Sequence, residues 1–413
     1  MSDDHKVLGL PENACIFPWK HVAIDVNGEV KPCCRFQPRY HRTGPDKDLK
    51  IPVISEGMKK AYIDSEFFKK IRERMLNNEK LAICNKCWDA EAASGKSMRT
   101  NFNAEYTDRV LDGEFSKEEI LTPTLDYLEI GFSSHCNLAC RMCGPRLSSK
   151  WAAIERQYNL APNPNEVCKE PDFDIDSFDV DLSKLKSIKI IGGEPLLAKE
   201  HDQFIQKLLE THNSLDQLEI TYHTNGTILP SKKILEFWKK IKQVKLTVSV
   251  DGFGELNNYL RPGQLKWDTI DRNVRQFVEW AKEKDSNIVV STHSVISRIN
   301  VMHLKELNDW IVDCGFTQLR EQEHTIDVLA YPLHMSLNWA PEDSKKLILT
   351  VIKTLLSENP NIVFNKSGMD WLQGVLSNPT PEDKLITVEQ LEQEMKLLDD
   401  HFGANFSDLK GVL

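Results

Sequence analysis

Short hydrophobic runs recur from residue 125 onward, and most of them are separated by segments long enough for a helix. The segments 199–211, 231–242 and 268–284 have the spacing of helices that bury one face. Strands that alternate with helices predict parallel βα units. We therefore expect an α/β fold with a partial (β/α)6 barrel of TIM type and an active site at the carboxyl ends of its strands. The six predicted strands are 125–132, 187–193, 218–224, 244–250, 287–296 and 316–322.

The two ends of the chain have other patterns. The N-terminal part is irregular and rich in turns, and its stretch 21–32 predicts a β-hairpin that turns at Asn27-Gly28. After residue 335 the pattern is helical, and Thr387 and Gln390 fit a capping box that opens a final amphipathic helix. We therefore expect a small cysteine-rich hairpin module at 1–120, the barrel at 121–335 and a C-terminal helical extension at 336–413.

Composition and charge exclude several classes of protein. The chain is 40% hydrophobic and 28% charged, as folded soluble proteins are, and no apolar run approaches the roughly 20 residues that span a bilayer. Its first residues lack a basic region followed by an apolar stretch, so we expect a cytoplasmic protein without membrane contact. The net charge of -10 disfavours nucleic acid as a partner, because a negative surface repels phosphate groups. The most basic stretch, 232–245, is interpreted as the solvated face of a helix.

Three cysteines follow the first predicted barrel strand. Cys136, Cys140 and Cys143 form a CX3CX2C sequence. In a reducing compartment, clustered cysteines are more often metal ligands than disulfide partners. Three thiolates can hold a cluster of four irons and leave one iron without a protein ligand. A zinc site is the alternative, and it needs a fourth ligand, for which His135 is available.

The sequence CNLACRMC resembles the signature of the radical S-adenosylmethionine (SAM) superfamily, and the resemblance extends over roughly residues 124–335. It implies a 4Fe-4S cluster that chelates SAM and cleaves it to a 5′-deoxyadenosyl radical, which abstracts hydrogen from a substrate. Gly192, Gly193 and Glu194 end the second strand and are similar to the GGEP motif of that family. There the glycines let the backbone approach the methionine moiety, and the Glu meets its ammonium group.

The resemblance implies further contacts to SAM. Asn225 ends the third strand, and Ser249 and Asp251 end the fourth, where similar proteins supply a hydroxyl or carboxylate to the ribose. Met142 is expected to cover the adenine. Ordinary Asn-Gly and Asp-Gly turns, and a Met that fills a core, are the alternatives.

A second set of cysteines lies in the N-terminal module. Twelve residues separate Cys15 from Gly28 and four more separate Gly28 from Cys33, while Cys84 and Cys87 form a CX2C pair. This pattern resembles the CX9-15GX4C opening of the twitch and SPASM auxiliary-cluster modules. It implies a second, auxiliary 4Fe-4S cluster with four protein ligands, which passes electrons or staples the module together.

This second resemblance has departures and an alternative. In most similar families the auxiliary module follows the barrel, whereas here it precedes it, and Cys34 is a fifth thiol without an assigned role. Zinc held by four cysteines is the alternative. Trp19 and Trp88 are expected to exclude water from the cluster. Cys168 and Cys314 stand alone and are interpreted as ordinary small apolar residues.

The resemblance implies an enzyme that modifies a peptide or protein side chain, because families with two such clusters commonly modify peptides. It also implies a reductant such as flavodoxin or ferredoxin. The alternatives are a radical SAM enzyme acting on a small carbohydrate or nucleotide-derived metabolite, and a non-catalytic zinc-binding interaction protein. Polar residues near the last two strands are candidate substrate contacts, although an ordinary polar or structural role is the stronger interpretation for each of them. They are His293, Arg298, Glu321, Glu323 and His324.

Overall fold

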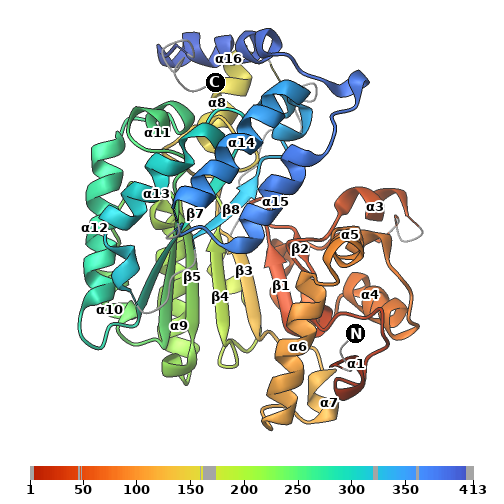
Figure 1. Cartoon of the computed structure of the whole chain (residues 1–413). Helices are drawn as coiled ribbons and strands as arrows, with labels where there is room; N and C mark the ends of the chain where they lie inside the picture. The colour runs from red at the N-terminus through yellow and green to blue at the C-terminus, as the bar shows by residue number, and fades with distance from the viewer. Residues whose placement is uncertain are drawn as a thin grey trace. The chain divides into compact units, whose positions relative to one another are not determined.

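The computed structural model describes residues 4–44, 47, 49–158, 160, 174–319, 324–359 and 362–405. Its strands form one sheet in the order β2-β1-β3-β4-β5-β6-β7-β8 (Figure 1). The strands are β1 His21–Ile24, β2 Val30–Lys31, β3 Tyr127–Gly131, β4 Ser187–Ile191, β5 Glu219–Thr224, β6 Gln243–Ser249, β7 Ile288–Ile296 and β8 Thr325–Val328. From β3 onward the strands follow chain order across the sheet, as successive βα units do. The predicted α/β class is confirmed.

Five of the six predicted strands are present within about two residues of their expected ends, and the sixth is wrong. Residues Phe316–Gln318 of the predicted strand 316–322 form a short 3-10 helix that follows Gly315, whose φ is +85°. The last strand is instead Thr325–Val328, which pairs in parallel with His293–Ile296 of β7. Its β-branched residues favour extended backbone, whereas the polar run before it does not alternate.

The helices predicted between the strands are confirmed. Helix α9 spans Lys199–Thr211, α10 spans Lys232–Trp238 and α12 spans Trp267–Lys282. Helix α10 buries Ile234, Phe237 and Trp238 and leaves its lysines exposed, as expected for a solvated basic face. The other helices are α1 Asp4–Val7, α2 Phe17–Lys20, α3 Pro38–Thr43, α4 Glu66–Leu76, α5 Asn85–Ser94, α6 Met98–Leu111, α7 Lys117–Ile120, α8 Ser149–Tyr158, α11 Glu255–Leu260, α13 Leu304–Asp313, α14 Glu342–Glu358, α15 Lys366–Ser377 and α16 Val388–Phe402.

The chain forms two compact units, and neither is one continuous segment. The first unit comprises residues 1–134, 168–220 and 240–242. In it the predicted hairpin is present: β1 pairs antiparallel with β2, and the Gly28 N–H donates to the Asp25 carbonyl at 2.8 Å across the turn. The other side of β1 pairs in parallel with β3, so the hairpin continues the sheet of this unit.

The second unit comprises residues 135–167, 221–239 and 243–413. Helix α15 lies close against β8, since a Cβ atom on Gly368 would lie 2.5 Å from the Ile326 side chain. Helix α16 begins with the predicted capping box, in which the Thr387 side chain accepts from the Gln390 N–H. Leu391 and Met395 of α16 are buried in a hydrophobic cluster with residues of α11. No helix in the described ranges is long and apolar enough to cross a membrane.

Candidate active site

Cys136, Cys140 and Cys143 lie in the loop after β3, and hydrogen bonds tie this loop to the last residue of α11 and to the residues that follow it. The Ala139 N–H donates to the Pro262 carbonyl at 2.9 Å, and the Arg141 N–H donates to the Leu260 carbonyl at 2.8 Å. A Cβ atom on Gly263 would lie 2.4 Å from the Leu138 side chain. Glycine therefore permits the close approach that fixes the cysteine loop.

The structure brings the three thiols of this loop together in a buried place. Burial raises the pKa of the Cys140 thiol, and the neighbouring Cys143 and Cys136 raise it further, while Arg261 opposes them. Burial also raises the pKa of Cys143. Thiols in such surroundings keep their protons until a metal displaces them. The donor set suits an iron-sulfur cluster, since thiolates are its usual protein ligands.

Two N–H donors point at the sulfurs of this loop. The Asn225 side-chain amide donates to Cys136 Sγ at 3.8 Å, and Arg261 Nη1 donates to Cys140 Sγ at 3.8 Å. Such contacts stabilise thiolates and tune the potential of a cluster. The sequence analysis missed Arg261, because no motif marks it beyond the Pro-Gly turn after it.

Asp251 supports Arg261 in the structure. Its carboxylate is buried and engaged twice, by Arg261 Nε at 2.6 Å and by the Val295 N–H at 2.7 Å. Ser249 is half-buried at the end of β6, opposite His293 of β7. The ribose contacts predicted for Ser249 and Asp251 stay predictions.

Asn225 and Met142 were predicted to contact SAM, and the alternatives were an ordinary turn for Asn225 and a core-filling role for Met142. Asn225 Oδ1 accepts from the Thr227 N–H at 3.0 Å, as in a turn, while its amide group supports Cys136. Met142 packs against the hydrophobic cluster that includes Tyr259 and Leu391. Its contact with adenine stays a prediction.

The GGEP motif belongs to the first unit, where it closes tightly on the end of β3. The Gly193 N–H donates to the Ser133 carbonyl at 3.0 Å. Gly192 has a φ of +121°, and a Cβ atom on it would lie 2.8 Å from the same carbonyl. Glu194 is buried and accepts from the Leu196 N–H at 3.3 Å. Backbone crowding therefore requires glycine at 192, and the SAM contacts of this motif stay predictions.

A buried charge cluster joins the cysteine loop to α16. Arg141 forms an ion pair with Asp399 at 2.7 Å and donates from Nε to the Tyr259 carbonyl at 2.8 Å. Its guanidinium carbon lies 3.8 Å from the centre of the Tyr259 ring. The sequence analysis missed this cluster, whose partners are far apart along the chain.

We expect the Asp399→Ala substitution to destabilise the second unit. It leaves the Arg141 charge buried without its carboxylate, which typically costs about 3–5 kcal/mol. Chemical denaturation measures the free energy of unfolding, and Asp400→Ala is the matched control because Asp400 is exposed. Equal stability of the two variants would contradict the role given to the ion pair.

In the first unit, the structure brings the four predicted auxiliary ligands around one pocket. Cys15, Cys33, Cys84 and Cys87 line it. Burial raises the pKa of Cys15 to about 12. Burial also raises the pKa of Cys33, and Cys84, Cys34, Cys15 and Cys87 raise it further, which is expected of thiols that lie close together. The apolar wall includes Phe17, Phe36, Ile71 and Met75. Trp19 and Trp88 are buried, and their role in excluding water from the cluster stays a prediction.

Within the described ranges, no three or more His, Cys, Asp or Glu side chains are grouped as a site for a metal ion. The ligands of a four-iron cluster each bind a different iron, and so stand farther apart than the ligands of one ion.

Cys34 lies outside the four-thiol pocket although Cys33 lines it. Its side chain is exposed, hydrogen-bonded to Glu129 and 4.0 Å from Met98 Sδ. Glu129 is also paired with Lys189 at 3.2 Å. The structure therefore selects Cys33 over Cys34 as the fourth thiol of the pocket. Cys314 is buried, and Cys168 lies outside the described residues.

The candidate substrate contacts separate into structural and accessible residues. Arg298 is buried and donates to the His334 and Ile386 carbonyls, and burial lowers its pKa to about 10. His324 is buried beside Thr292, and burial lowers its pKa to about 4. His293 is half-buried and lies 3.2 Å from Asp327 Oδ2. Glu321 and Glu323 lie outside the described residues.

Comparisons with known proteins match two regions of the chain, each of which contains one of the cysteine sets. The family model "Radical SAM superfamily" matches residues 130–311, and the model "Iron-sulfur cluster-binding domain" (SPASM) matches residues 15–88. The GTP 3',8-cyclase of Nautilia profundicola is 30% identical over 209 residues, which cover 50% of this chain and 59% of that protein. The GTP 3',8-cyclase of Helicobacter pylori is 32% identical over 127 residues, which cover 31% of this chain and 35% of that protein. The chain thus spans less than two thirds of these relatives.

Among the solved structures that match part of this chain, anSMEcpe with bound AdoMet and Cp18Cys peptide has a TM-score of 0.37 and 16% identity over 58% of this chain and 62% of that chain. Streptococcus suis SuiB bound to precursor peptide SuiA has a TM-score of 0.36 and 15% identity over 72% of this chain and 62% of that chain. The two matched family models imply a 4Fe-4S cluster with SAM and an auxiliary iron-sulfur cluster. Residues 130–311 therefore belong to the radical SAM superfamily, and a SPASM iron-sulfur cluster-binding domain at residues 15–88 precedes them in the chain.

Proposed function

We propose that this chain is a radical SAM enzyme in which Cys136, Cys140 and Cys143 hold the cluster that binds SAM. The observation that carries the proposal is the buried three-thiol loop, at whose sulfurs Asn225 and Arg261 direct N–H groups. When bound, the cluster and SAM supply a 5′-deoxyadenosyl radical that abstracts hydrogen from a substrate. The residues of the chain hold the sulfurs, exclude water and set the charge around them.

The predicted contacts to SAM belong to this proposal. The backbone at Gly192 and Gly193 and the Glu194 carboxylate are proposed to receive the methionine part of SAM. Ser249 is the proposed ribose contact, because its half-buried hydroxyl is more accessible than the engaged carboxylate of Asp251. Met142 is proposed to lie against the adenine.

The auxiliary cluster is proposed to bind Cys15, Cys33, Cys84 and Cys87. Four thiolates leave no iron open for a substrate, so this cluster would carry electrons or stabilise its unit. The electron source would be a one-electron donor such as flavodoxin or ferredoxin. Both clusters need a reducing compartment, which supports a cytoplasmic location.

We propose a peptide or protein side chain as the substrate. The strands of the second unit carry half-buried polar side chains that are mostly uncharged. The rings of His223 and His293 are 6.4 Å apart, and the hydroxyls of Thr247 and Ser291 are 3.3 Å apart. Among the residues of β5–β8, all of which are described, Lys245 is the one Lys or Arg. A triphosphate usually needs several cationic partners, whereas a peptide needs hydrogen-bonding groups.

A nucleotide-derived metabolite is the second candidate. It is favoured by the 30% identity to a GTP 3',8-cyclase over half of this chain. The low cationic content of the strands weighs against it.

The substrate class can be tested by anaerobic incubation of the reconstituted protein with SAM and reductant. One arm contains a pool of synthetic peptides that together present all side chains, and the other contains GTP. We expect the peptide arm to raise 5′-deoxyadenosine formation severalfold and to yield a peptide of altered mass. Conversion of GTP without any change in the peptides would replace the first candidate with the second.

A further inference from the structure

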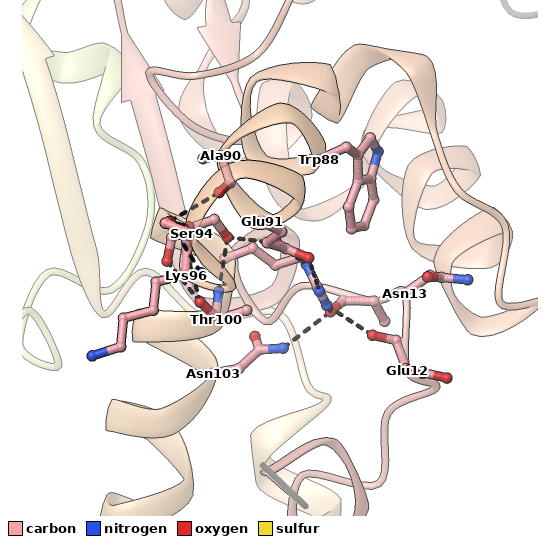
Figure 2. A network of polar contacts seen from close by, with 12 residues as sticks. Glu12, Asn13, Trp88, Ala90, Glu91, Ser94, Lys96, Thr100 and Asn103 are labelled. Carbon is pink, nitrogen blue, oxygen red and sulfur yellow. Dashed lines mark hydrogen bonds and ion pairs between the residues drawn. The ribbon is translucent and has the colours of Figure 1, made fainter. Parts of the chain in front are cut away.

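Arg99 lies in the wall of the four-thiol pocket, and all of its guanidinium nitrogens donate hydrogen bonds. Its Nε and Nη2 donate to the two carboxylate oxygens of Glu91 at 2.9 and 2.6 Å. Its Nη1 donates to the Glu12 and Ala14 carbonyls at 2.7 and 3.1 Å. Figure 2 shows Glu12, Glu91 and Trp88 around this network. Bidentate pairing of this kind fixes both orientation and charge.

These contacts connect the segments that carry the auxiliary ligands. Glu91 lies on α5, the helix that carries Cys87, and Ala14 directly precedes Cys15. Asn103, one turn further along α6, holds the same segment, since its amide donates to the Ala14 carbonyl and its Oδ1 accepts from the Ile16 N–H, both at 3.0 Å. Arg99 also covers the Trp88 ring, with its guanidinium carbon 4.7 Å from the ring centre.

The ion pair has a defined direction relative to the thiols. Arg99 borders both the four-thiol pocket and a second pocket of about 630 Å³, whereas Glu91 borders only the second. The positive end of the pair therefore faces the sulfurs.

We propose that the Arg99–Glu91 pair sets the reduction potential of the auxiliary cluster. One-electron reduction adds a negative charge to the cluster, and a cation in the pocket wall stabilises that charge. Arg99 therefore raises the potential, and Glu91 offsets part of this effect. Both act as positioning residues, because neither is a ligand. The inference rests on the proposed auxiliary ligand set and is independent of the substrate.

An anaerobic redox titration followed by electron paramagnetic resonance (EPR) tests this proposal. The parent protein carries Cys136→Ala, Cys140→Ala and Cys143→Ala, so that only the auxiliary cluster is loaded. We expect Arg99→Met to shift the potential to a more negative value and Glu91→Gln to shift it to a more positive value. Arg99→Lys keeps the charge and should lie closer to the parent than Arg99→Met.

If the pair only held the fold, Arg99→Met and Glu91→Gln would shift the reduction potential in the same direction or leave it unchanged. Either result overturns the proposal. If Arg99→Met does not retain a cluster, the reduction potential of Glu91→Gln decides by itself: a more positive value supports the proposal, and an unchanged or more negative value contradicts it. Arg109→Lys is a control with matched chemistry, because Arg109 pairs with both oxygens of Asp126 and lies 4.7 Å from the Tyr106 ring centre but does not border the pocket. Its potential should equal that of the parent, and a shift as large as that of Arg99→Met would also count against the proposal.

The result of this redox titration does not depend on whether the protein forms 5′-deoxyadenosine. Opposite shifts of the auxiliary potential would stand even if the protein with both clusters formed no 5′-deoxyadenosine. An absence of any cluster in the parent variant would overturn the inference directly.

Discussion

Cys140→Ala is expected to abolish 5′-deoxyadenosine formation. Two remaining thiolates cannot hold the cluster as three do, and the Arg261 guanidinium loses the sulfur it faces. We expect product to fall by at least a hundredfold, together with the loss of roughly four irons per chain. Chromatography of anaerobic reactions with SAM and dithionite measures the product, and iron analysis measures the cluster.

Cys314→Ala is the control for this variant. Cys314 is buried at the end of α13 in the same unit and is not among the groups that affect Cys140. We expect it to retain both product and iron. Undiminished product from Cys140→Ala would remove Cys140 from the cluster ligands.

The adjacent residues Cys33 and Cys34 should give opposite results. Cys33→Ala removes one of four thiols from the auxiliary pocket, whereas Cys34→Ala removes a thiol that contacts Glu129 outside it. In protein that lacks the three-thiol set, we expect Cys33→Ala to lose most of the remaining iron and acid-labile sulfide. Cys34→Ala should keep roughly four irons per chain.

The two variants control for each other, since they change the same residue type at neighbouring positions. Iron and sulfide are measured on the same anaerobic preparations. Retention of the cluster by Cys33→Ala and its loss from Cys34→Ala would show that Cys34, not Cys33, is the ligand.

The parts of the fold that could be predicted are those encoded locally. The alternation of apolar strands with amphipathic helices defines β3–β7 and α9, and Thr387 with Gln390 marks the start of α16. The last strand was misplaced because β8 has only four residues, and its pairing with β7 is what fixes it. Short strands of this kind depend on their neighbours more than on their own sequence.

In the candidate site, too, the features encoded locally could be predicted, whereas those that depend on tertiary contacts could not. The cysteines could be predicted because their spacing along the chain is itself the motif. Arg261, Arg141 and Arg99 carry no such mark, since each has at least one partner far away along the chain. Arg261 and Cys140 are 121 residues apart, and Arg99 and Glu12 are 87 residues apart. An arginine in the sequence is most often a solvated side chain, so tertiary packing was needed to reveal these three.

The most direct test of the central claim is the EPR spectrum of reduced protein with and without SAM. Cys33→Ala and Cys87→Ala together are used to remove the auxiliary cluster, so that the signal reports on the cluster of Cys136, Cys140 and Cys143 alone. An iron without a protein ligand predicts a clear change of the signal when SAM binds. A cluster whose spectrum is the same with saturating SAM would contradict the account.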